Sequence, residues 1–491
     1  MINMVYPSDY ENKTGFDRIR AQVRGKCTTD GGRALLDGEG FSASAGEIAH
    51  RLSLCSELQE ILMLESGFPL QEYTDIGPVA RKIEVAGTFL DIEDMIALRA
   101  GLGAVNEITA FLAAKEEGRY PVLRGLAQGV ESFPEITGHI DTILDRYGKI
   151  KDSASPELYT IRRTIRDREG QVSKRLQAIL SKAQKDGYAD ADAAVSIRDG
   201  RAVIPVSAAN KRKINGFIHD ESATGKTFYI EPVEIVEINN ELKELEYAER
   251  REVVRILTAF TDRIRPDAPG IARAGEYLAC MDMIRAKARW AAVNDCVKPV
   301  LSEEGTLWLR SARHPLLRQT LAREGKQVVP LDLKLDRGRR MLVISGPNAG
   351  GKSVCLKTVG LLQYMFQCGF PVPVLENSEF PVFDGIFIDI GDEQSIDNDL
   401  STYSSHLLNM KHMLAGAGSG SLVLIDEFGS GTEPVIGGAI AEAILERFVE
   451  TGTYGVITTH YSNIKYFAGS HEGVELSLIH ISEPTRPLYI S

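Results

Sequence analysis

The sequence lacks the patterns by which cysteine and histidine usually hold metal ions. Neither a C-x-x-C pair nor a histidine cluster occurs, and the six cysteines are scattered at Cys27, Cys55, Cys280, Cys296, Cys355 and Cys368. Structural zinc sites need closely spaced ligands, so no zinc site is expected. The thiols are expected to be reduced, which predicts a cytoplasmic protein.

Long apolar runs and an excess of basic residues are also missing. The N-terminus carries acidic and polar residues where a signal peptide would have an apolar core. No apolar run approaches the roughly 18 residues of a membrane span, so neither secretion nor membrane insertion is expected. The net charge of -12 excludes a basic coat over the whole surface, and contacts with a polyanion would need a local patch.

A phosphate-binding loop pattern, G-x-x-x-x-G-K-[ST], lies within residues 341–358, which read MLVISGPNAGGKSVCLKT. Its glycines let backbone N–H groups surround a triphosphate, and Lys352 can reach the outer phosphates. Isolated matches occur by chance, but the apolar strand before the loop and the helix after it favour nucleotide binding. The predicted ATP-binding residues are Gly346, Pro347, Asn348, Ala349, Gly350, Gly351, Lys352, Ser353 and Val354.

A second nucleotide-site motif is the apolar run 422–425, which ends in two carboxylates, Asp426 and Glu427. A buried parallel strand would deliver Asp426 to a magnesium ion, so the predicted metal ligands are Ser353 and Asp426. Glu427 can orient and deprotonate the attacking water. The alternative, two acids that merely end a strand, is disfavoured by the upstream loop. The expected cofactors are ATP and Mg²⁺, with Lys352 and Glu427 among the catalytic residues.

Two polar residues that follow apolar strands are predicted to contact the γ-phosphate. Gln394 comes after the strand 386–390 and could sense this phosphate. His460 ends the strand 456–459 and is the third predicted catalytic residue, although a lone histidine is often structural. His314 is interpreted as structural, within a segment expected to form a lip over the nucleotide base.

Hydroxyl side chains at Ser401, Thr402 and Ser404 precede a helical pattern at 407–414. Such residues are good N-caps, and they also make an anion-binding surface. One chain carries one phosphate loop and one such helix start. We therefore expect this segment to contact the ATP of the other subunit in a homodimer.

The region before the phosphate loop predicts a projecting arm. Helical patterns fill residues 7–129, and a long charged helical pattern then runs to 185, with a predicted start at Pro156. Between 194 and 230 the spacing of apolar residues changes from a helical to a strand pattern, and Asp199-Gly200 marks a hairpin turn. Helices return at 233–261 and 274–293. Helix out, β tip and helix back is the layout of an arm.

Basic residues in this arm are candidates for nucleic-acid contact. Lys211, Arg212 and Lys213 lie in the tip beside aromatic residues, which suits backbone phosphates without base readout. Such a cluster can equally be ordinary surface. The basic residues between 162 and 185 are likewise either a solvated helix face or a polyanion contact.

The predicted fold is multidomain: an all-α lever and core with a projecting helical clamp arm carrying a small β tip, followed by an α/β ABC-type P-loop ATPase domain. The predicted boundaries are 1–130 for the helical core, 131–272 for the clamp arm with its tip at about 190–232, 273–300 for a returning lever helix, 301–475 for a C-terminally incomplete ATPase domain and 476–491 for an atypical tail.

Taken together, the segments GPNAGGKS, DEQS, STYSSH, LVLIDE, GSGTEP and TTHY resemble the MutS mismatch-repair ATPases, an ABC-type family. Residues 219–232 (HDESATGKTFYIEP) and 311–317 (SARHPLL) resemble its second branch, often called endonuclease MutS type two. The resemblance covers roughly residues 6–475. It implies a homodimer that clamps branched or mismatched DNA and suppresses recombination, and that in some members acts on collided ribosomes.

The last residues depart from this resemblance. The family would continue through a helical linker into a small nuclease module, whereas residues 476–491 read LSLIHISEPTRPLYIS. Endonuclease activity is therefore expected only if the native protein carries that module.

Alternative functions remain open. One is a ribosome-associated ATPase that splits stalled or collided ribosomes and contacts rRNA with the same arms. A chromosome-organising ATPase is disfavoured because every arm precedes Lys352 instead of separating the two nucleotide motifs. A transporter ATPase is disfavoured because Ser401 to Ser404 replaces the usual serine-glycine-glycine signature and no membrane partner segment occurs.

Overall fold

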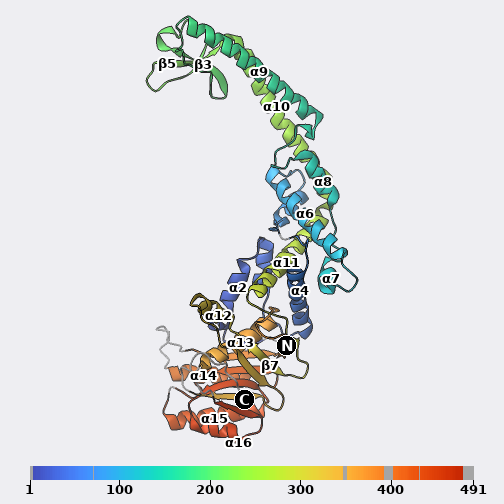
Figure 1. Cartoon of the computed structure of the whole chain (residues 1–491), viewed down its shortest axis with the longest axis vertical. Helices are drawn as coiled ribbons and strands as arrows, with labels where there is room; N and C mark the ends of the chain where they lie inside the picture. Colours follow the sequence, from blue (N-terminus) through green and yellow to red (C-terminus); the bar gives the residue numbers. More distant parts are fainter. Residues whose placement is uncertain (1–3, 70, 347–350, 392–401, 431, 479–491) are drawn as a thin grey trace. The chain divides into compact units, whose positions relative to one another are not determined.

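The computed structural model describes residues 4–69, 71–346, 351–391, 402–430 and 432–478. Contacts divide the chain into two compact units (Figure 1). The first comprises Met1–Asp75, Ala104–Val130 and Arg273–Ser491, and the second comprises Ile76–Gly103 and Glu131–Ala272. Two of the four boundaries between the units fall inside helices, α6 (Ile92–Ala113) and α11 (Ala268–Val293). The domain boundaries given above stay a prediction.

A parallel sheet with strand order β1-β11-β12-β13-β9-β14 lies in the first unit. Its strands are β1 (Met4–Tyr6), β9 (Met341–Ser345), β11 (Gly385–Asp389), β12 (Ser421–Ile425), β13 (Tyr454–Thr459) and β14 (Val474–Leu478). Strands β9, β11, β12 and β13 are buried throughout, as expected for parallel strands covered on both faces. Their carboxyl ends meet at one edge, where α/β folds bind ligands.

Helical crossovers connect these strands, which confirms the mixed α/β class predicted for this part of the chain. The helices are α13 (Lys352–Gln367), α14 (Thr402–Gly416), α15 (Pro434–Glu450) and α16 (Ser462–Ser470). One apolar core joins Met413 of α14, Phe448 of α15 and Ile464 of α16 to the strands. Helix α13 is buried over most of its length, which fixes the segment that follows the phosphate loop.

Strand β1 was not predicted from the sequence. Val5 and Tyr6 pair in parallel with Ile386 and Phe387 of β11. The Tyr6 hydroxyl also donates to Asn409 Oδ1 of α14 over 2.7 Å. A strand of three residues is too short to show a period-2 pattern, so only the fold reveals it.

A second sheet in the same unit has strand order β6-β10-β7-β8. It consists of β6 (Val300–Leu301), β10 (Glu379–Phe380), β7 (Leu307–Ala312) and β8 (Leu331–Leu335), and α12 (Pro315–Arg323) follows β7. Trp308, expected in a lip over the nucleotide base, lies in β7, and contact with a base stays a prediction. Asp332 accepts a hydrogen bond from the N–H of Ser311 over 2.9 Å, at a residue with φ of 50°. Asp332 thus stabilises a strained residue within β7, where the register of pairing with β8 shifts.

The helical part of the first unit confirms the helical patterns read from the sequence. It contains α1 (Tyr10–Thr14), α2 (Phe16–Arg24), α3 (Asp30–Gly38), α4 (Ala45–Leu64) and α7 (Pro121–Ala127), together with most of α11. All six cysteines are free thiols, and five of them are buried. Burial raises the pKa of the Cys55 and Cys355 thiols to about 12, so they are unreactive.

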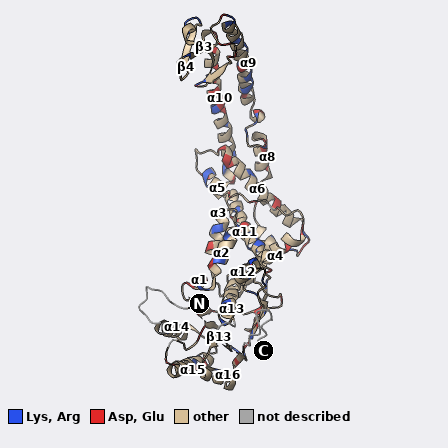
Figure 2. Cartoon of the chain, turned by 60° about the vertical axis from the view of Figure 1, so that its left-hand side comes forward, with Lys and Arg blue, Asp and Glu red and all other residues tan. Residues whose placement is uncertain are grey.

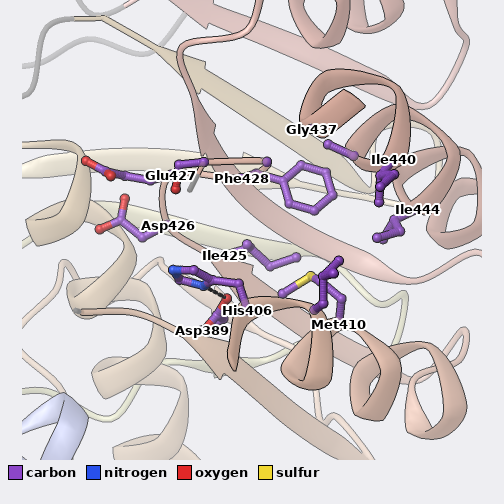
Figure 3. Close-up of a pocket in the computed structure, with 14 residues that line it drawn as sticks. Asp389, His406, Met410, Ile425, Asp426, Glu427, Phe428, Gly437, Ile440 and Ile444 are labelled. Carbon is purple, nitrogen blue, oxygen red and sulfur yellow. Dashed lines mark hydrogen bonds and ion pairs between the residues drawn. The ribbon is translucent and has the colours of Figure 1, made fainter. Parts of the chain in front are cut away.

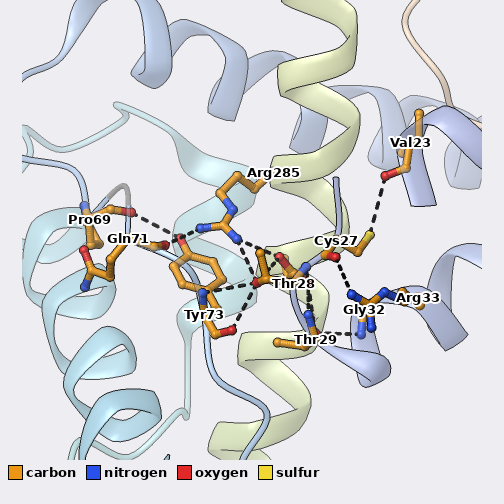
Figure 4. A network of polar contacts seen from close by, with 11 residues as sticks. Val23, Cys27, Thr28, Thr29, Gly32, Arg33, Pro69, Gln71, Tyr73 and Arg285 are labelled. Carbon is orange, nitrogen blue, oxygen red and sulfur yellow. Dashed lines mark hydrogen bonds and ion pairs between the residues drawn. The ribbon is translucent and has the colours of Figure 1, made fainter. Parts of the chain in front are cut away.

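A buried polar network joins α11 to the residues before α3 (Figure 4). Asp282, fully buried, accepts hydrogen bonds from the backbone N–H groups of Thr28 and Thr29 and from Arg285 Nη2, each over 2.8 Å. The Arg285 guanidinium lies 3.6 Å from the centroid of the Tyr73 ring. A buried ion pair of this kind is costly to break, because removing one partner leaves the other charge without compensation.

Two long helices of the second unit, α9 (Pro156–Lys185) and α10 (Val233–Ile264), pack along each other, and the sheet between them in sequence lies at one end of the pair (Figure 1). The predicted start of α9 at Pro156 is confirmed. The Ser155 hydroxyl oxygen accepts from Leu158 N over 3.0 Å, as an N-cap does, and the hydroxyl donates to Glu252 of α10 over 2.5 Å. The unit also contains α5 (Gly77–Glu84) and α8 (Pro134–Ile143).

The small sheet, here called the tip, has strand order β2-β3-β5-β4. Its antiparallel strands are β2 (Ser196–Arg198), β3 (Arg201–Ser207), β4 (Gly216–Glu221) and β5 (Thr227–Pro232). Asp199 and Gly200 have φ of 49° and 72°, so the predicted hairpin turn is confirmed with both central residues left-handed. Ile204 and Ile230 pack against Leu176 of α9 and Ile235 of α10.

One buried carboxylate holds the tip to α10. Glu231, 1% exposed, accepts from Arg201 Nη1 over 2.8 Å, from Asn239 Nδ2 over 2.7 Å, and lies 2.6 Å from His219 Nε2. Burial raises the pKa of Glu231, but the hydrogen bonds from Asn239, His219 and Arg201 outweigh it and leave the pKa below its usual value. Glu231 is therefore ionised and stabilises the contact between the tip and α10.

Charges of both signs are distributed along α9 and α10 (Figure 2). Arg162 pairs with Asp152 and Glu249, each at 2.8 Å, and Arg168 pairs with Glu241 at 3.0 Å. Arg162 and Arg168 are thus neutralised by neighbouring acids, which favours a solvated helix face over a polyanion contact for these two residues.

Helix α6 is the one described helix that is long and apolar enough to cross a membrane by length and composition. Its most apolar window has mean hydropathy 1.3, and 44% of that window is buried within the protein. Core helices of soluble proteins pass the same test, and Glu93, Asp94, Arg99 and Glu107 interrupt the apolar sequence.

Candidate functional site

Lys352 opens α13 directly after the phosphate loop. Gly351, with φ of 74°, is the N-cap, a left-handed position that favours glycine. The Lys352 side chain is buried, and its ammonium donates to the carbonyl oxygen of Gly346 over 2.6 Å and to His460 Nε2 over 2.9 Å. Burial lowers the pKa of Lys352, and the nearby carboxylates of Asp426 and Glu427 oppose this shift. The ammonium therefore lies near enough to both predicted acids for their charges to favour its protonated form.

Asp426 and Glu427 follow β12 at the carboxyl edge of the sheet (Figure 3). The Thr458 hydroxyl, on the neighbouring strand β13, donates to Asp426 Oδ1 over 2.5 Å and accepts from the Glu427 N–H over 2.8 Å. Glu427 has φ of 49°, a strained conformation for a residue with a side chain. The structure thus brings together Lys352, Asp426, Glu427 and His460, which were predicted from three separate segments.

Thr458, which sequence reasoning assigned no role, makes this arrangement possible. Its hydroxyl satisfies one carboxylate oxygen and one backbone donor at the same time, so it fixes both acids against the adjacent strand. Only the parallel pairing of Leu424 and Ile425 with Val456 and Ile457 places it there. The signal available in the sequence was its position near the end of an apolar strand.

A second carboxylate–histidine pair lies beside the predicted acids and was also missed. Asp389 ends β11, and its Oδ2 lies 2.6 Å from His406 Nδ1 of α14 (Figure 3). Asp389 and His406 line a hollow together with Asp426, Glu427 and the apolar side chains of Leu407, Met410, Ile425, Phe428, Ile440, Ala441 and Ile444. In Figure 3 the charged groups lie at one end of this hollow and the apolar side chains of Phe428, Ile440 and Ile444 at the other.

Several predicted site residues lie outside the described part of the chain. These are Pro347, Asn348, Ala349 and Gly350 of the phosphate loop, the γ-phosphate sensor Gln394, and Ser401, and the side chain of Thr402 is likewise not described. Ser353 and Val354 are exposed in the first turn of α13, and Ser404 lies partly buried in the first turns of α14. The trans contact of this segment stays a prediction.

The predicted magnesium ligands do not form an all-protein metal cage. Within the described residues, no group of three or more His, Cys, Asp and Glu side chains is placed to hold a metal ion. Mg²⁺ at a nucleotide site is usually held by one or two side chains together with phosphates and water. The hydroxyl of Ser353 and the carboxylate of Asp426 are suitable donors for this kind of shell.

His314 has a structural role in the described geometry. It is the N-cap of α12, and its Nδ1 accepts from Leu317 N over 3.4 Å. Burial lowers the pKa of His314 to about 4, so the imidazole is neutral at pH 7. This agrees with the interpretation made from the sequence.

The predicted nucleic-acid contacts in the tip are partly engaged with the protein. The Lys211 ammonium lies 4.3 Å from the centroid of the Phe228 ring, whereas Arg212 and Lys213 are exposed. Phe217 and Ile218, on the edge strand β4, are also exposed.

Comparison with known proteins shows which proteins the chain is similar to. Residues 342–490 match the family model for MutS domain V. Endonuclease MutS2 of Geobacillus sp. (strain WCH70) is 35% identical over 477 residues, which cover 96% of this chain and 60% of the relative. The chain is thus similar to MutS2 proteins over most of its length, and its C-terminal part matches MutS domain V.

Other relatives extend over the same part of the chain. Endonuclease MutS2 of Thermomicrobium roseum is 38% identical over 473 residues, which cover 94% of this chain and 58% of the relative. Endonuclease MutS2 of Pelotomaculum thermopropionicum is 39% identical over 435 residues, which cover 88% of this chain and 54% of the relative. The chain thus spans between half and two thirds of the length of the curated relatives it matches, and the resemblance read from its motifs is confirmed.

Proposed function

We propose that the chain forms a homodimer that binds and hydrolyses ATP and, according to its nucleotide state, closes its arms on branched or mismatched DNA and so suppresses recombination. The observation that carries this proposal is the convergence of Lys352, Asp426, Glu427 and His460 at the carboxyl edge of one parallel sheet. The similarity to MutS2 relatives over most of the chain supports it.

The residues of the site have complementary roles in the proposed hydrolysis. The Lys352 ammonium neutralises the outer phosphates, and Glu427 accepts a proton from the attacking water, a contribution of about 10² to 10⁴ in rate. His460, within hydrogen-bond distance of Lys352, contacts the γ-phosphate and reports its presence. Ser353 and Asp426 hold the Mg²⁺, which neutralises charge that develops on the phosphates.

A second subunit completes the site in this proposal. The segment Ser401, Thr402 and Ser404 contributes hydroxyl and N–H donors to the ATP of the partner, where the N-terminus of α14 favours negative charge. Gln394 senses the γ-phosphate from the same subunit. Hydrolysis then depends on the concentration of the protein, because neither subunit has a complete site by itself.

The clamp arm is proposed to consist of α9, α10 and the tip. Arg212 and Lys213 are exposed at the tip and contact backbone phosphates, with Lys211 beside them. Localisation in the cytoplasm and the ATPase domain at 301–475 are part of the same proposal. The names of the relatives include endonuclease activity. We propose this activity only for a protein that also contains the part of the relatives that this chain does not cover.

The test is the ATPase activity of the purified chain as a function of protein concentration, with and without four-way junction DNA. Activity per subunit should rise steeply through the range in which dimers form, and junction DNA should bind at low salt. Lys352→Ala is the control for contaminating ATPases. Activity per subunit that does not change on dilution contradicts the shared site, and binding to ribosomes without binding to junctions assigns the arms to a different partner.

A further inference from the structure

Asp389 connects helix α14 to the predicted catalytic strand. It is the last residue of β11 and is 1% exposed. Its Oδ2 lies 2.6 Å from His406 Nδ1, and its Oδ1 accepts from Asn409 Nδ2 over 2.8 Å, so both carboxylate oxygens are bound by α14. Its backbone carbonyl oxygen accepts from the N–H of Asp426 over 2.9 Å. One residue therefore contacts both α14 and the end of β12.

The protonation of His406 follows from these contacts. An ionised carboxylate can only accept hydrogen bonds, and a buried carboxylate stays ionised only if donors surround it. With Asp389 ionised, the hydrogen of this bond is on His406 Nδ1, and the imidazole donates the hydrogen bond to Asp389. Figure 3 shows the imidazole of His406 between Asp389 and the side of the hollow where Asp426 and Glu427 lie.

Polar contacts take part in positioning the first turns of α14. Ser405 and Asn409 are buried there, whereas Leu408 is 45% exposed. The apolar anchors Met410 and Met413 come later in the helix. Apolar packing tolerates small sliding movements, but two hydrogen bonds to one carboxylate fix both position and rotation. A displacement of the start of α14 must therefore strain the contacts of Asp389.

From Asp389 the contacts continue to both predicted acids. The N–H of Asp426 is bound to the Asp389 carbonyl, the side chain of Asp426 accepts from Thr458, and Thr458 accepts from the N–H of Glu427. The path from the start of α14 to Glu427 thus consists of hydrogen bonds of 2.5 to 2.9 Å. It stays within one unit and within one subunit.

We propose that the His406–Asp389 hydrogen bond couples the two ATP sites of the dimer. This inference rests on the proposed function, which places the start of α14, where Ser404 lies, against the ATP of the partner. Binding or loss of ATP in the partner moves the start of α14, and Asp389 transmits that movement to Asp426 and Glu427 of the same subunit. His406 is a positioning residue in this scheme, because it acts through its hydrogen bond to Asp389.

Mixed dimers test the direction of this coupling. A reporter subunit that can hydrolyse ATP is paired, by two affinity tags, with a partner that carries either Glu427→Gln, which holds ATP, or Lys352→Ala, which cannot bind it. The ratio of reporter rates with these two partners measures the coupling. We expect a ratio that differs from one by at least fivefold.

His406→Phe in the reporter removes the donor but keeps a ring, and it should bring the ratio within twofold of one. The same substitution in the partner should leave the ratio unchanged. In the partner, the hydrogen bonds from His406 lead to Asp426 and Glu427 of that same subunit, and not to those of the reporter. His406→Asn in the reporter should keep the ratio, because an amide Nδ2 can donate from near the position of Nδ1. A merely structural role would affect both placements of His406→Phe equally.

The outcomes separate this inference from the proposed function. Mixed dimers that neither bind nor hydrolyse ATP contradict the proposed function. Mixed dimers that hydrolyse ATP with the same ratio whether or not the reporter carries His406→Phe overturn the coupling and leave the function intact. If mixed dimers with Lys352→Ala do not assemble, homodimers provide the test. The Hill coefficient for ATP hydrolysis should fall to one in the His406→Phe homodimer if this hydrogen bond couples the sites. Asn409→Leu, which removes the other donor to Asp389, should act in the same way if His406→Phe fails to fold.

Discussion

The hydroxyl of Thr458 donates to Asp426 Oδ1 over 2.5 Å, so a residue of β13 fixes the predicted magnesium ligand on β12. The same oxygen accepts from the N–H of Glu427, whose backbone has φ of 49°. Strain of this kind costs about 1 to 3 kcal/mol and persists only where surrounding contacts impose it. The hydroxyl of Thr458 therefore contributes to the geometry of both acids.

Thr458→Val keeps the shape of the side chain and removes both hydrogen bonds. It leaves a buried carboxylate oxygen and a backbone donor without this partner, at a cost of about 1 to 3 kcal/mol. We expect a lower melting temperature and a kcat for ATP hydrolysis that falls much more than KM rises, because the acids are displaced. Thr458→Ser, which keeps the hydroxyl, is the matched control. Equal kcat values for the two variants would contradict this role.

Glu427→Gln should separate ATP binding from hydrolysis. The amide cannot accept the proton of the attacking water, so turnover should fall by about 10² to 10⁴. ATP binding, measured with a fluorescent analogue, should remain within a few-fold of the unsubstituted chain. Glu450→Gln, at an exposed position that pairs with Arg447 at 2.9 Å, is the control and should leave both quantities unchanged. Loss of binding together with turnover would assign Glu427 a different role.

Asp282→Ala should destabilise the first unit strongly. It removes the acceptor of Thr28, Thr29 and Arg285 and leaves the guanidinium buried without its carboxylate, at a cost of about 3 to 5 kcal/mol. Asp37→Ala, which removes an exposed pair with Arg24 at 3.1 Å, should cost at most about 1 kcal/mol. Thermal unfolding of both variants at the same pH measures the difference. Similar melting temperatures would show that the network of Figure 4 contributes little to stability.

His314 makes stability depend on pH below neutrality. Burial lowers its pKa to about 4, compared with about 6.5 in an unfolded chain, so the unfolded state binds the proton more readily between these values. The stabilising contribution is complete above pH 6.5 and decreases as pH falls towards 4. At pH 4.5 the loss should reach about 2 to 3 kcal/mol.

His314→Asn should abolish this part of the pH dependence, because asparagine does not titrate and still caps α12. Denaturant unfolding at pH 7 and pH 4.5 measures it. The two proteins should be similar in stability at pH 7, and the asparagine variant should lose less at pH 4.5. Parallel losses in both proteins would assign the acid sensitivity to other groups.

The sequence predicts those parts of the site in which one short segment performs one task. A phosphate loop and a strand that ends in two acids have fixed composition, so Lys352, Asp426 and Glu427 could be placed before the fold was known. The contacts that orient them could not. Tyr6 and Asn409 are 403 positions apart, and nothing in the chain order indicates that they meet.

The same argument applies to the fold. The strands of the tip, the start of α9 and the long helices were predicted, because period and turn residues are local signals. The three residues of β1 and the pairing of Asp389 with His406 depend on strand order, which single-sequence patterns do not encode. The ion pairs of α9 likewise depend on the packing of the helices, and they favour a solvated helix face over a polyanion contact for the basic residues that form them.

Substitutions at the tip test whether its exposed basic residues are the ones that contact nucleic acid. Arg212→Gln together with Lys213→Gln should weaken junction binding and reduce the slope of log K against log salt by about 2, since each phosphate contact contributes about 0.9. Lys211→Gln alone should change the slope less, because its ammonium lies 4.3 Å from the centroid of the Phe228 ring. Arg166→Gln, exposed but paired with Asp152 at 3.0 Å, is the control. Equal effects of the tip and control substitutions would place the contact along α9 instead of at the tip.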